Sequence, residues 1–250
     1  MQPNAHMQGA NRTINSFFGT VYIINLRTRP DRRSEMAEQL ERIGLGFESP
    51  NLRLFEAIKP DDPAGFPTVG ARGCFMSHVA VLRDAGRRGA SSVLILEDDL
   101  NFCENFGTRF SAIARRLEAS DWGMFYGSYF LDKALEQSGA PCTPVDPQRL
   151  IGTSAFLAVN GNHIDALAGY LEAMLKRAPG DPQGGPMHID GAYCWFRKSH
   201  PDVLTFLASN PLGFQRSSKT DVHPLRWYDS TAWSACVISR LRRWRNRLRG

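Results

Sequence analysis

Short apolar runs alternate with amphipathic stretches along most of the chain. The two clearest runs, at residues 21–24 and 93–96, are four residues long and rich in β-branched and aliphatic side chains. Such runs are typical of strands that are buried on both faces of a parallel sheet. Weaker runs that fit strands lie at 51–55, 122–126, 155–159 and near Val203.

Helical spacing follows most of these runs. Met36, Leu40 and Ile43 recur at i, i+4 and i+7, and glycines end that stretch. Further helices are expected after Gly73 and over 106–118, 162–177 and 188–198, with a long loop over 127–149. Strands that alternate with helices predict an α/β fold with a mostly parallel central sheet flanked by helices.

We expect three segments: a flexible lead-in at 1–19, a single α/β domain at 20–230 and a basic amphipathic helix at 231–250. The lead-in is polar and lacks the apolar region of a secretory signal. No stretch approaches the ~20 apolar residues that a membrane-spanning helix requires. The last segment has one apolar helical face, formed by Val237, Leu241, Trp244 and Leu248.

The positive net charge of +5 comes from the end of the chain. Six arginines lie in the last eleven residues, and the remaining chain has 24 Lys and Arg against 25 Asp and Glu. We therefore expect no nucleic-acid-binding face on the body. A helix that carries tryptophan and arginine suits an anionic membrane surface. Packing of this helix on the body, with solvated arginines, is the alternative.

The five cysteines are odd in number, widely spaced and form no C-x-x-C pair. This pattern argues against a disulfide framework and against a structural zinc site. A reducing compartment is the simple interpretation, so we expect a cytoplasmic protein, with peripheral binding to the inner face of the cytoplasmic membrane as an extension.

Three acidic residues, Glu97, Asp98 and Asp99, follow the clearest predicted strand directly. Ligands of open α/β sheets bind beyond the carboxyl ends of the strands. Three crowded carboxylates repel one another, and a divalent cation with its preference for oxygen ligands removes that repulsion. The triplet therefore predicts a metal site, although a solvated turn or helix cap is the plain alternative.

Several segments together resemble glycosyltransferase family 25, whose members include lipopolysaccharide and collagen galactosyltransferases. The matching segments, in order, are Ile23–Leu26 with Pro30–Arg33, Gly70–Cys74 with Ser77–His78, Leu96–Asp99, Gly152–Ala155, His188–Asp190 and Gln215–Asp221. The resemblance departs at Thr220-Asp221-Val222, where the family pattern has Ser-Asp-Ile.

This resemblance implies a GT-A-type, Rossmann-like fold, a UDP-sugar donor with galactose as the first guess, and a divalent metal, Mn²⁺ before Mg²⁺. The residues expected to bind the donor are Asn25, Arg32, Gly70, Gly73, Ser77, His78, Glu97 and Gln215. The metal ligands expected are Glu97 and Asp99, with a third from Asp221 or His223. Structural alternatives exist for several of these residues: Asn25 could form a turn, the glycines could mark a helix boundary, and His78 could pack in the core.

Transfer with inversion needs a base that takes a proton from the acceptor hydroxyl. Asp190 is our candidate and Asp98 its rival, while a helix cap is the structural alternative for Asp190. The acceptor is expected to be a saccharide or lipid-linked oligosaccharide, such as a lipopolysaccharide core.

Two other functions remain open from the sequence. A metal-dependent nucleotidyl or phosphoryl transferase would share the acidic strand end, although no G-x-x-x-x-G-K-[ST] phosphate loop is present. A non-catalytic, membrane-peripheral protein of the same fold would be expected to have lost the acidic triplet, which is intact here.

Overall fold

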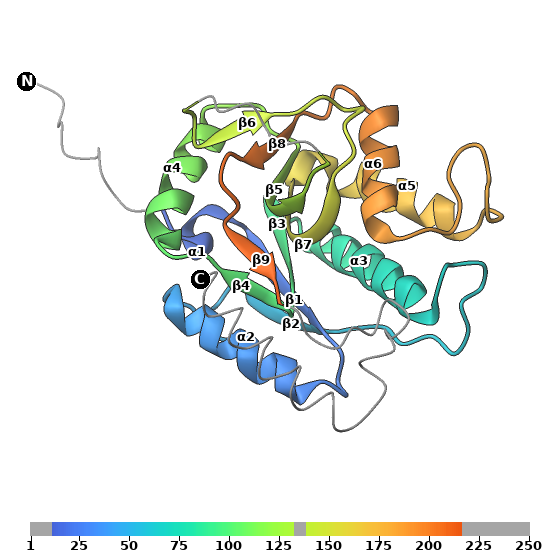
Figure 1. The fold of residues 1–250 in the computed structure, drawn as a ribbon, viewed down its shortest axis with the longest axis horizontal. Coiled ribbons are helices and arrows are strands. Elements are labelled where there is room, and N and C mark those ends of the chain that lie inside the picture. Colours follow the sequence, from blue (N-terminus) through green and yellow to red (C-terminus); the bar gives the residue numbers. More distant parts are fainter. Residues whose placement is uncertain (1–11, 133–138, 217–250) are drawn as a thin grey trace, which may run out of the picture.

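A computed structural model describes residues 12–132 and 139–216 of the chain. A seven-stranded sheet in the order β2-β1-β3-β7-β5-β8-β6 forms its centre (Figure 1). The strands are β1 (Thr20–Asn25), β2 (Leu52–Glu56), β3 (Ser92–Glu97), β5 (Met124–Phe130), β6 (Cys142–Pro144), β7 (Gly152–Asn160) and β8 (Thr205–Ala208). A separate two-stranded ribbon pairs β4 (Leu100–Phe102) with β9 (Gly213–Gln215).

Five of the seven strands run in one direction, and only β7 and β6 run against them. The strand β1 pairs in parallel with both β2 and β3, and β5 pairs in parallel with β8. The strand β7 lies antiparallel between β3 and β5, and β6 lies antiparallel to β8 at the edge. The expectation of an α/β fold with a mostly parallel sheet flanked by helices is therefore confirmed.

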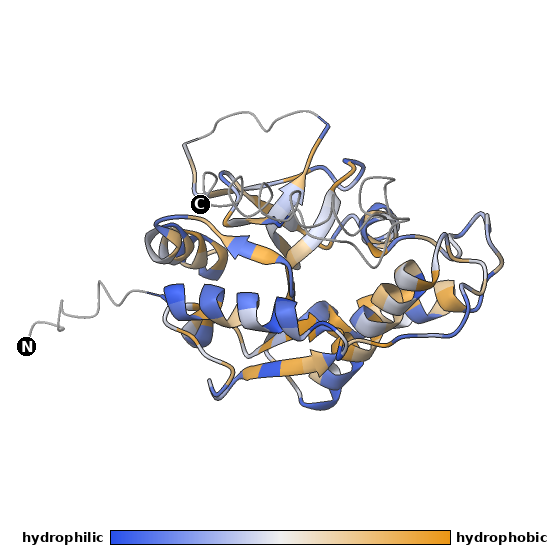
Figure 2. Cartoon of the chain, turned by 60° about the horizontal axis from the view of Figure 1, so that its bottom comes forward, coloured by the Kyte–Doolittle hydropathy of each residue, from blue (hydrophilic) through white to orange (hydrophobic). Residues whose placement is uncertain are grey.

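Helices cover both faces of this sheet (Figure 1). One face packs against α3 (Val69–Arg87), α5 (Gly161–Leu175) and α6 (Ile189–Ser199). The other packs against α1 (Ile14–Phe17), α2 (Pro30–Arg42) and α4 (Phe106–Glu118). In Figure 2 the helices carry hydrophilic residues on their outer sides.

The core has two layers because side chains alternate between the faces of a strand. In β1, Tyr22 and Ile24 belong to the α3 layer, and Val21 and Ile23 belong to the α2 layer. All residues of β1 are buried, and the hydrophobic residues of β3 divide in the same way. Burial on both faces explains why these strands read as continuous apolar runs in the sequence.

The sequence-based elements agree with the structure except in four places. The helix expected after Gly73 begins at Val69, so Gly70 and Gly73 lie inside α3. The segment expected to be a loop over 127–149 contains the end of β5 and all of β6. The ribbon of β4 and β9 was not expected from the sequence. Within the segment expected to be a flexible lead-in, α1 forms, and Ile14 and Phe18 are buried in the core.

Some sequence-based expectations fall outside the described residues. These are the metal ligands Asp221 and His223 and the basic amphipathic helix at 231–250. Among the helices that the structure describes, none has the length and apolar character needed to cross a membrane.

Candidate functional site

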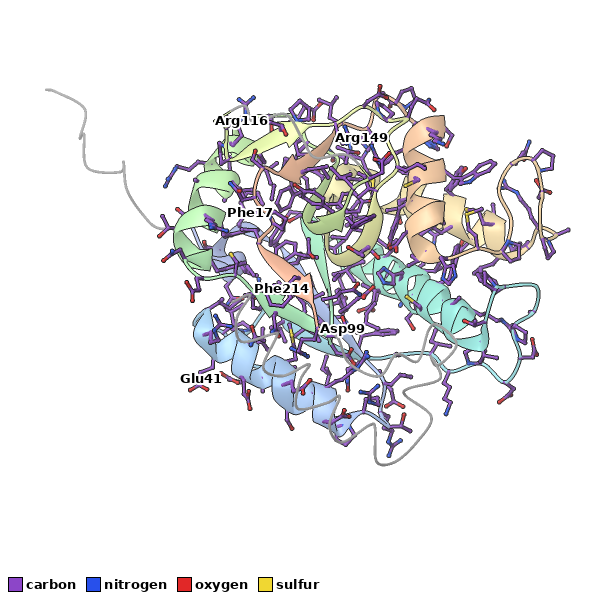
Figure 3. The ribbon with its side chains drawn as sticks, viewed as in Figure 1. Phe17, Glu41, Asp99, Arg116, Arg149 and Phe214 are labelled. Atoms are coloured by element: carbon purple, nitrogen blue, oxygen red, sulfur yellow. The ribbon has the colours of Figure 1, made fainter. Side chains whose placement is uncertain are left out.

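Several backbone ends converge at one edge of the sheet. The strands β1 and β3 end there, and β7 begins there because it runs antiparallel to β3. The first turns of α3 and α6 reach the same place, where they contribute lining residues to a cavity of about 690 Å³. Figure 3 shows Asp99 at this edge, beside the end of the β4–β9 ribbon. This is the position at which open α/β sheets bind their ligands.

Most of the residues predicted from the sequence line this cavity. The lining includes Arg32, Gly70, Gly73, His78, Glu97, Asp98, Asp99, Asp190 and Gln215. Asn25 and Ser77 are buried behind the wall and support it. The fold thus brings together residues that lie up to 190 positions apart in the chain.

Asp98 is anchored by two donors, one to each carboxylate oxygen. The Asn25 side-chain amide donates to Oδ2 at 2.7 Å, and the Arg32 guanidinium donates to Oδ1 at 2.9 Å. The side chains of Arg32 and Asp98 are only 11% and 8% exposed. This arrangement favours a structural role for Asp98, which ties the ends of β1 and β3 to the first turn of α2.

Glu97 and Asp99 face the cavity with fewer compensating charges. Burial raises the pKa of Glu97 well above its ordinary value, and the negative charges of Asp99, Asp190 and Asp98 add to that shift. Burial also raises the pKa of Asp99, although Arg32, 3.5 Å away, acts in the opposite direction. Gln215 donates to Glu97 at 2.8 Å and to Asp99 at 3.5 Å, so it bridges the two carboxylates.

These carboxylates fit a divalent cation. Hard cations such as Mg²⁺ and Mn²⁺ prefer carboxylate oxygens, and a positive ion offsets the repulsion that adds to the effect of burial on both pKa values. Glu97 and Asp99 could therefore both serve as oxygen ligands of a metal in this cavity.

His78 is fully buried on α3, and its Nδ1 lies 2.7 Å from the hydroxyl of Tyr193 on α6. Burial lowers the pKa of His78 to about 3, so its imidazole is neutral near pH 7. Its Nε2 points toward Glu97, with 3.9 Å between Nε2 and Oε1. The packing alternative for His78 thus holds for one edge of its ring, while the other edge faces the cavity.

Asp190 lies in the first turn of α6, where a carboxylate is favoured by the helix dipole. Its Oδ2 accepts the backbone N–H of Thr153 at 3.0 Å. Thr153 has a left-handed backbone, with φ of 60°, which is uncommon for a residue other than glycine. The start of β7 therefore adopts a costly conformation that presents its N–H to Asp190.

The loop after β2 is held against α3 by a close approach. A Cβ on Gly73 would collide with the carbonyl oxygen of Ile58, so only glycine permits this contact. Ser77 accepts the N–H of Ile58 at 2.8 Å and donates to the carbonyl of Gly73 at 2.7 Å. Gly73 and Ser77 thus shape the cavity wall rather than offering side chains to a ligand.

Three further cavity residues were not singled out from the sequence: Lys59, Cys74 and Arg216. Arg216 donates to the carbonyl oxygens of Asp98 and Leu100 and to the side chain of Asn101. Cys74 and Arg216 fall within segments that carry the family resemblance, which is the signal that points to them. Their positions depend on tertiary packing, which spacing along the chain does not reveal.

Comparison with known families gives a match over residues 18–133 to glycosyltransferase family 25, described as an LPS biosynthesis protein family. The matched segment contains Asn25, Arg32, His78 and the acidic triplet, and it ends before Asp190 and Gln215.

Curated relatives belong to the same family. An inactive glycosyltransferase 25 family member 3 from Homo sapiens is 31% identical over 145 residues, 50% of this chain and 24% of that protein. Procollagen galactosyltransferase 1-B from Xenopus laevis is 26% identical over 203 residues, 74% of this chain and 32% of that protein. The chain thus spans about a quarter to a third of the length of these relatives.

Solved structures resemble the chain at low sequence identity. A glycosyltransferase involved in the glycosylation of the major capsid of PBCV-1 is 12% identical with a TM-score of 0.36, over 76% of this chain and 91% of that one. The protein A197 from STIV is 9% identical with a TM-score of 0.40, over 78% of this chain and 82% of that one.

Proposed function

We propose that this chain transfers a sugar from a UDP-sugar donor to a saccharide acceptor, because residues 18–133 match glycosyltransferase family 25. The observation that carries the proposal is the pair Glu97 and Asp99, mostly buried and facing one cavity at the carboxyl ends of β1 and β3. Galactose is the sugar we test first, since a procollagen galactosyltransferase is among the relatives.

Glu97 and Asp99 would hold a divalent cation, Mn²⁺ or Mg²⁺. When bound, such a cation would supply positive charge that stabilises the negative charge of the leaving diphosphate. Arg32 and Lys59 line the same cavity and bring positive charge to its wall. Arg32 is already paired with Asp98, so its contribution to a diphosphate is shared with that carboxylate.

Asp190 is our choice for the base. Both oxygens of its rival Asp98 accept hydrogen bonds from Asn25 and Arg32, which leaves Asp98 poorly placed to accept a proton. Asp190 would take the proton of an acceptor hydroxyl, whose oxygen forms the new bond to the anomeric carbon. The bond from that carbon to the diphosphate breaks as the new bond forms, and the sugar configuration inverts.

The acceptor is proposed to be a saccharide, such as a lipopolysaccharide core or another lipid-linked oligosaccharide. The description of the matching family as LPS biosynthesis proteins supports this class. The procollagen relative indicates that the family is not confined to it.

The proposal is tested by measuring release of UDP from a panel of UDP-sugars, with and without saccharide acceptors, in Mn²⁺, Mg²⁺ or excess chelator. Nucleoside triphosphates serve as the comparison substrates. We expect turnover of one UDP-sugar that requires a divalent cation. Full activity in chelator would contradict the metal assignment, and turnover of nucleoside triphosphates alone would favour phosphoryl or nucleotidyl transfer.

Some relatives carry the word inactive in their names. Absence of turnover with every UDP-sugar, acceptor and metal would therefore place this chain with those relatives and refute the transferase proposal.

A further inference from the structure

A cysteine, a histidine and a glutamate meet at the wall of the cavity. Cys74 and His78 are separated by four positions on α3, so their side chains lie on one face of that helix. Both face Glu97 at the end of β3. The Cys74 sulfur, a ring nitrogen of His78 and a carboxylate oxygen of Glu97 all lie within 4.8 Å of one another.

One nitrogen of this histidine has no partner among residues 12–132 and 139–216. Its Nδ1 interacts with Tyr193 at 2.7 Å, whereas its Nε2 is buried and finds no hydrogen-bond partner in that described part of the chain. The nearest carboxylate oxygen, Oε1 of Glu97, is 3.9 Å away, which is too far for a hydrogen bond. A buried nitrogen left in this state costs free energy, unless a ligand outside the chain completes it.

The donor set selects a particular class of ion. Thiolate, imidazole and carboxylate together are the ligands of zinc, whereas Mg²⁺ and Mn²⁺ favour oxygen alone. Tetrahedral coordination at the usual zinc bond lengths separates the ligand atoms by roughly 3.4–3.6 Å. Small side-chain rotations would bring the observed atoms to that spacing.

We propose that Cys74, His78 and Glu97 form a binding site for a thiophilic divalent cation such as Zn²⁺, distinct from the all-oxygen site at Glu97 and Asp99. The Cys74 thiol releases its proton to solvent as the sulfur–metal bond forms. Three protein ligands leave one coordination position open to the cavity, as zinc sites that accept an exchangeable ligand do.

Tyr193 has a defined part in this site. A neutral imidazole carries one N–H, and donation of Nδ1–H to the Tyr193 oxygen leaves Nε2 with the lone pair that a metal requires. Partners of this kind fix the tautomer and the ring orientation of metal-binding histidines. Tyr193 is therefore a positioning residue for His78.

Glu97 belongs to both sites, so one Glu97 carboxylate serves one cation at a time. Zinc at Cys74 and His78 would withdraw Glu97 from the cation that the proposed transferase requires. This competition rests on the proposed function, whereas the zinc site itself does not and can be tested without any sugar donor.

The test is a titration of the full chain with Co²⁺, a spectroscopic substitute for Zn²⁺, followed by its thiolate-to-metal charge-transfer absorption. We expect this band in the wild type, its displacement by Zn²⁺ and its loss in Cys74→Ser. Cys103→Ser is the matched control, because Cys103 is also a partly buried free thiol, and should keep the band. No band in the wild type, or a band that persists in Cys74→Ser, would overturn the proposal.

A second measurement uses the unaltered chain and so does not depend on the folding of a variant. Alkylation of each cysteine is followed by peptide mass spectrometry with Zn²⁺, with Mg²⁺ or with neither. We expect Zn²⁺ to protect Cys74 and Mg²⁺ to leave it reactive. Equal labelling of Cys74 in all three conditions would refute the site.

Tyr193→Phe tests the positioning role. Removal of such a partner weakens metal binding by roughly 10–100-fold, so the Co²⁺ titration should shift to higher concentration by that factor while the band keeps its shape. An unchanged affinity would show that Tyr193 only packs against His78.

Discussion

Asp98 and Asp99 are neighbours in the chain but have different surroundings. Asp98 has a hydrogen-bond donor on each oxygen, and Asp99 shares its space with other carboxylates. The sequence predicts a metal site at the triplet, and the structure places Glu97, Asp98 and Asp99 in the lining of one cavity. The sequence left both residues open as candidates for chemistry, because the donors of Asp98 come from Asn25 and Arg32, 66 to 73 positions away.

The first prediction concerns the buried ion pair between Asp98 and Arg32. Asp98→Asn removes the charge that pairs with the buried Arg32 guanidinium and leaves one acceptor oxygen for the two donors Asn25 and Arg32. Breaking a buried ion pair costs about 3 kcal/mol or more. We expect chemical denaturation to show a fall of that size in the free energy of unfolding.

Asp31→Asn is the control, because Asp31 pairs with Arg29 on the surface and its side chain is 60% exposed. Its loss should cost less than about 1 kcal/mol. Equal losses in the two variants would refute the anchoring role.

The second prediction concerns the proposed metal ligand. Asp99→Asn removes one negative charge from the cation site, so kcat/KM for the preferred UDP-sugar should fall on the order of 100-fold, about 2.7 kcal/mol. The folded state should not lose stability, because burial already disfavours the charge of Asp99. Activity close to that of the wild type would contradict its role as a ligand.

At the scale of elements, the sequence predicts the strands and helices in which apolar side chains recur in a regular pattern. The strands β1 and β3 are buried on both faces and therefore read as continuous apolar runs in the sequence. The helix α4 has a regular apolar stripe, which gives helical spacing of its apolar residues. The strands β4 and β9 have three residues each, too few for any period, and pair only because the fold brings 100–102 beside 213–215. The strand β5 continues beyond Gly127 with two irregularities in its pairing register with β7. These irregularities interrupt the strand pattern, so the sequence did not predict where β5 ends.

The third prediction concerns the contact between α3 and the loop after β2. Gly73→Ala places a methyl group against the carbonyl of Ile58, so either the helix or the loop must shift. We expect a loss of about 1–3 kcal/mol in unfolding free energy, with weaker donor binding because the loop lines the cavity. Gly107→Ala in α4 is the control, since no described atom beyond its chain neighbours and its own helix backbone lies within 4 Å of the position that its new methyl group would take. Equal changes in unfolding free energy in the two variants would contradict the importance of the contact between Gly73 and Ile58.

The fourth prediction concerns pH and the attachment of α3 to β1. Asp84 of α3 accepts hydrogen bonds from Arg88 and from Tyr22 of β1, which lower the pKa of Asp84 from 3.8 to about 2. A carboxyl whose pKa is lower in the folded state stabilises that state above 3.8 and loses this effect as pH falls toward 2. The contribution is roughly 1 kcal/mol, because the side chain of Asp84 is 24% exposed and its partners Arg87 and Arg88 are more exposed, so solvent screens these contacts.

This pH effect is measured as the difference in unfolding free energy between the wild type and Asp84→Asn. The difference should be constant at neutral pH and shrink between about pH 4 and pH 2. A difference that does not vary over this range would show that the Tyr22–Asp84–Arg88 contact does not stabilise the fold.

At the scale of the whole molecule, the position of the site follows from the sheet order. The strands β1 and β3 point their carboxyl ends at one edge, and β7 returns to that edge with its amino end. The helices α3 and α6 begin beside it, and the β4–β9 ribbon brings Gln215 onto the acidic pair. The alternation of strands and helices predicts at which edge of the sheet the site lies. The contacts that Arg216, Thr153 and Tyr193 make around the cavity depend on the three-dimensional fold and cannot be predicted from the sequence.

The central proposal is that Glu97 and Asp99 bind a divalent cation and that this cation binds a nucleoside diphosphate in the cavity. The most direct test is the thermal unfolding midpoint of the wild type and of Asp99→Asn with UDP, with Mn²⁺ and with both together. A bound ligand raises the midpoint by mass action, so the wild type should be stabilised most by UDP and Mn²⁺ together and Asp99→Asn should not. An equal rise with UDP alone, or the same rise in both proteins, would contradict the account.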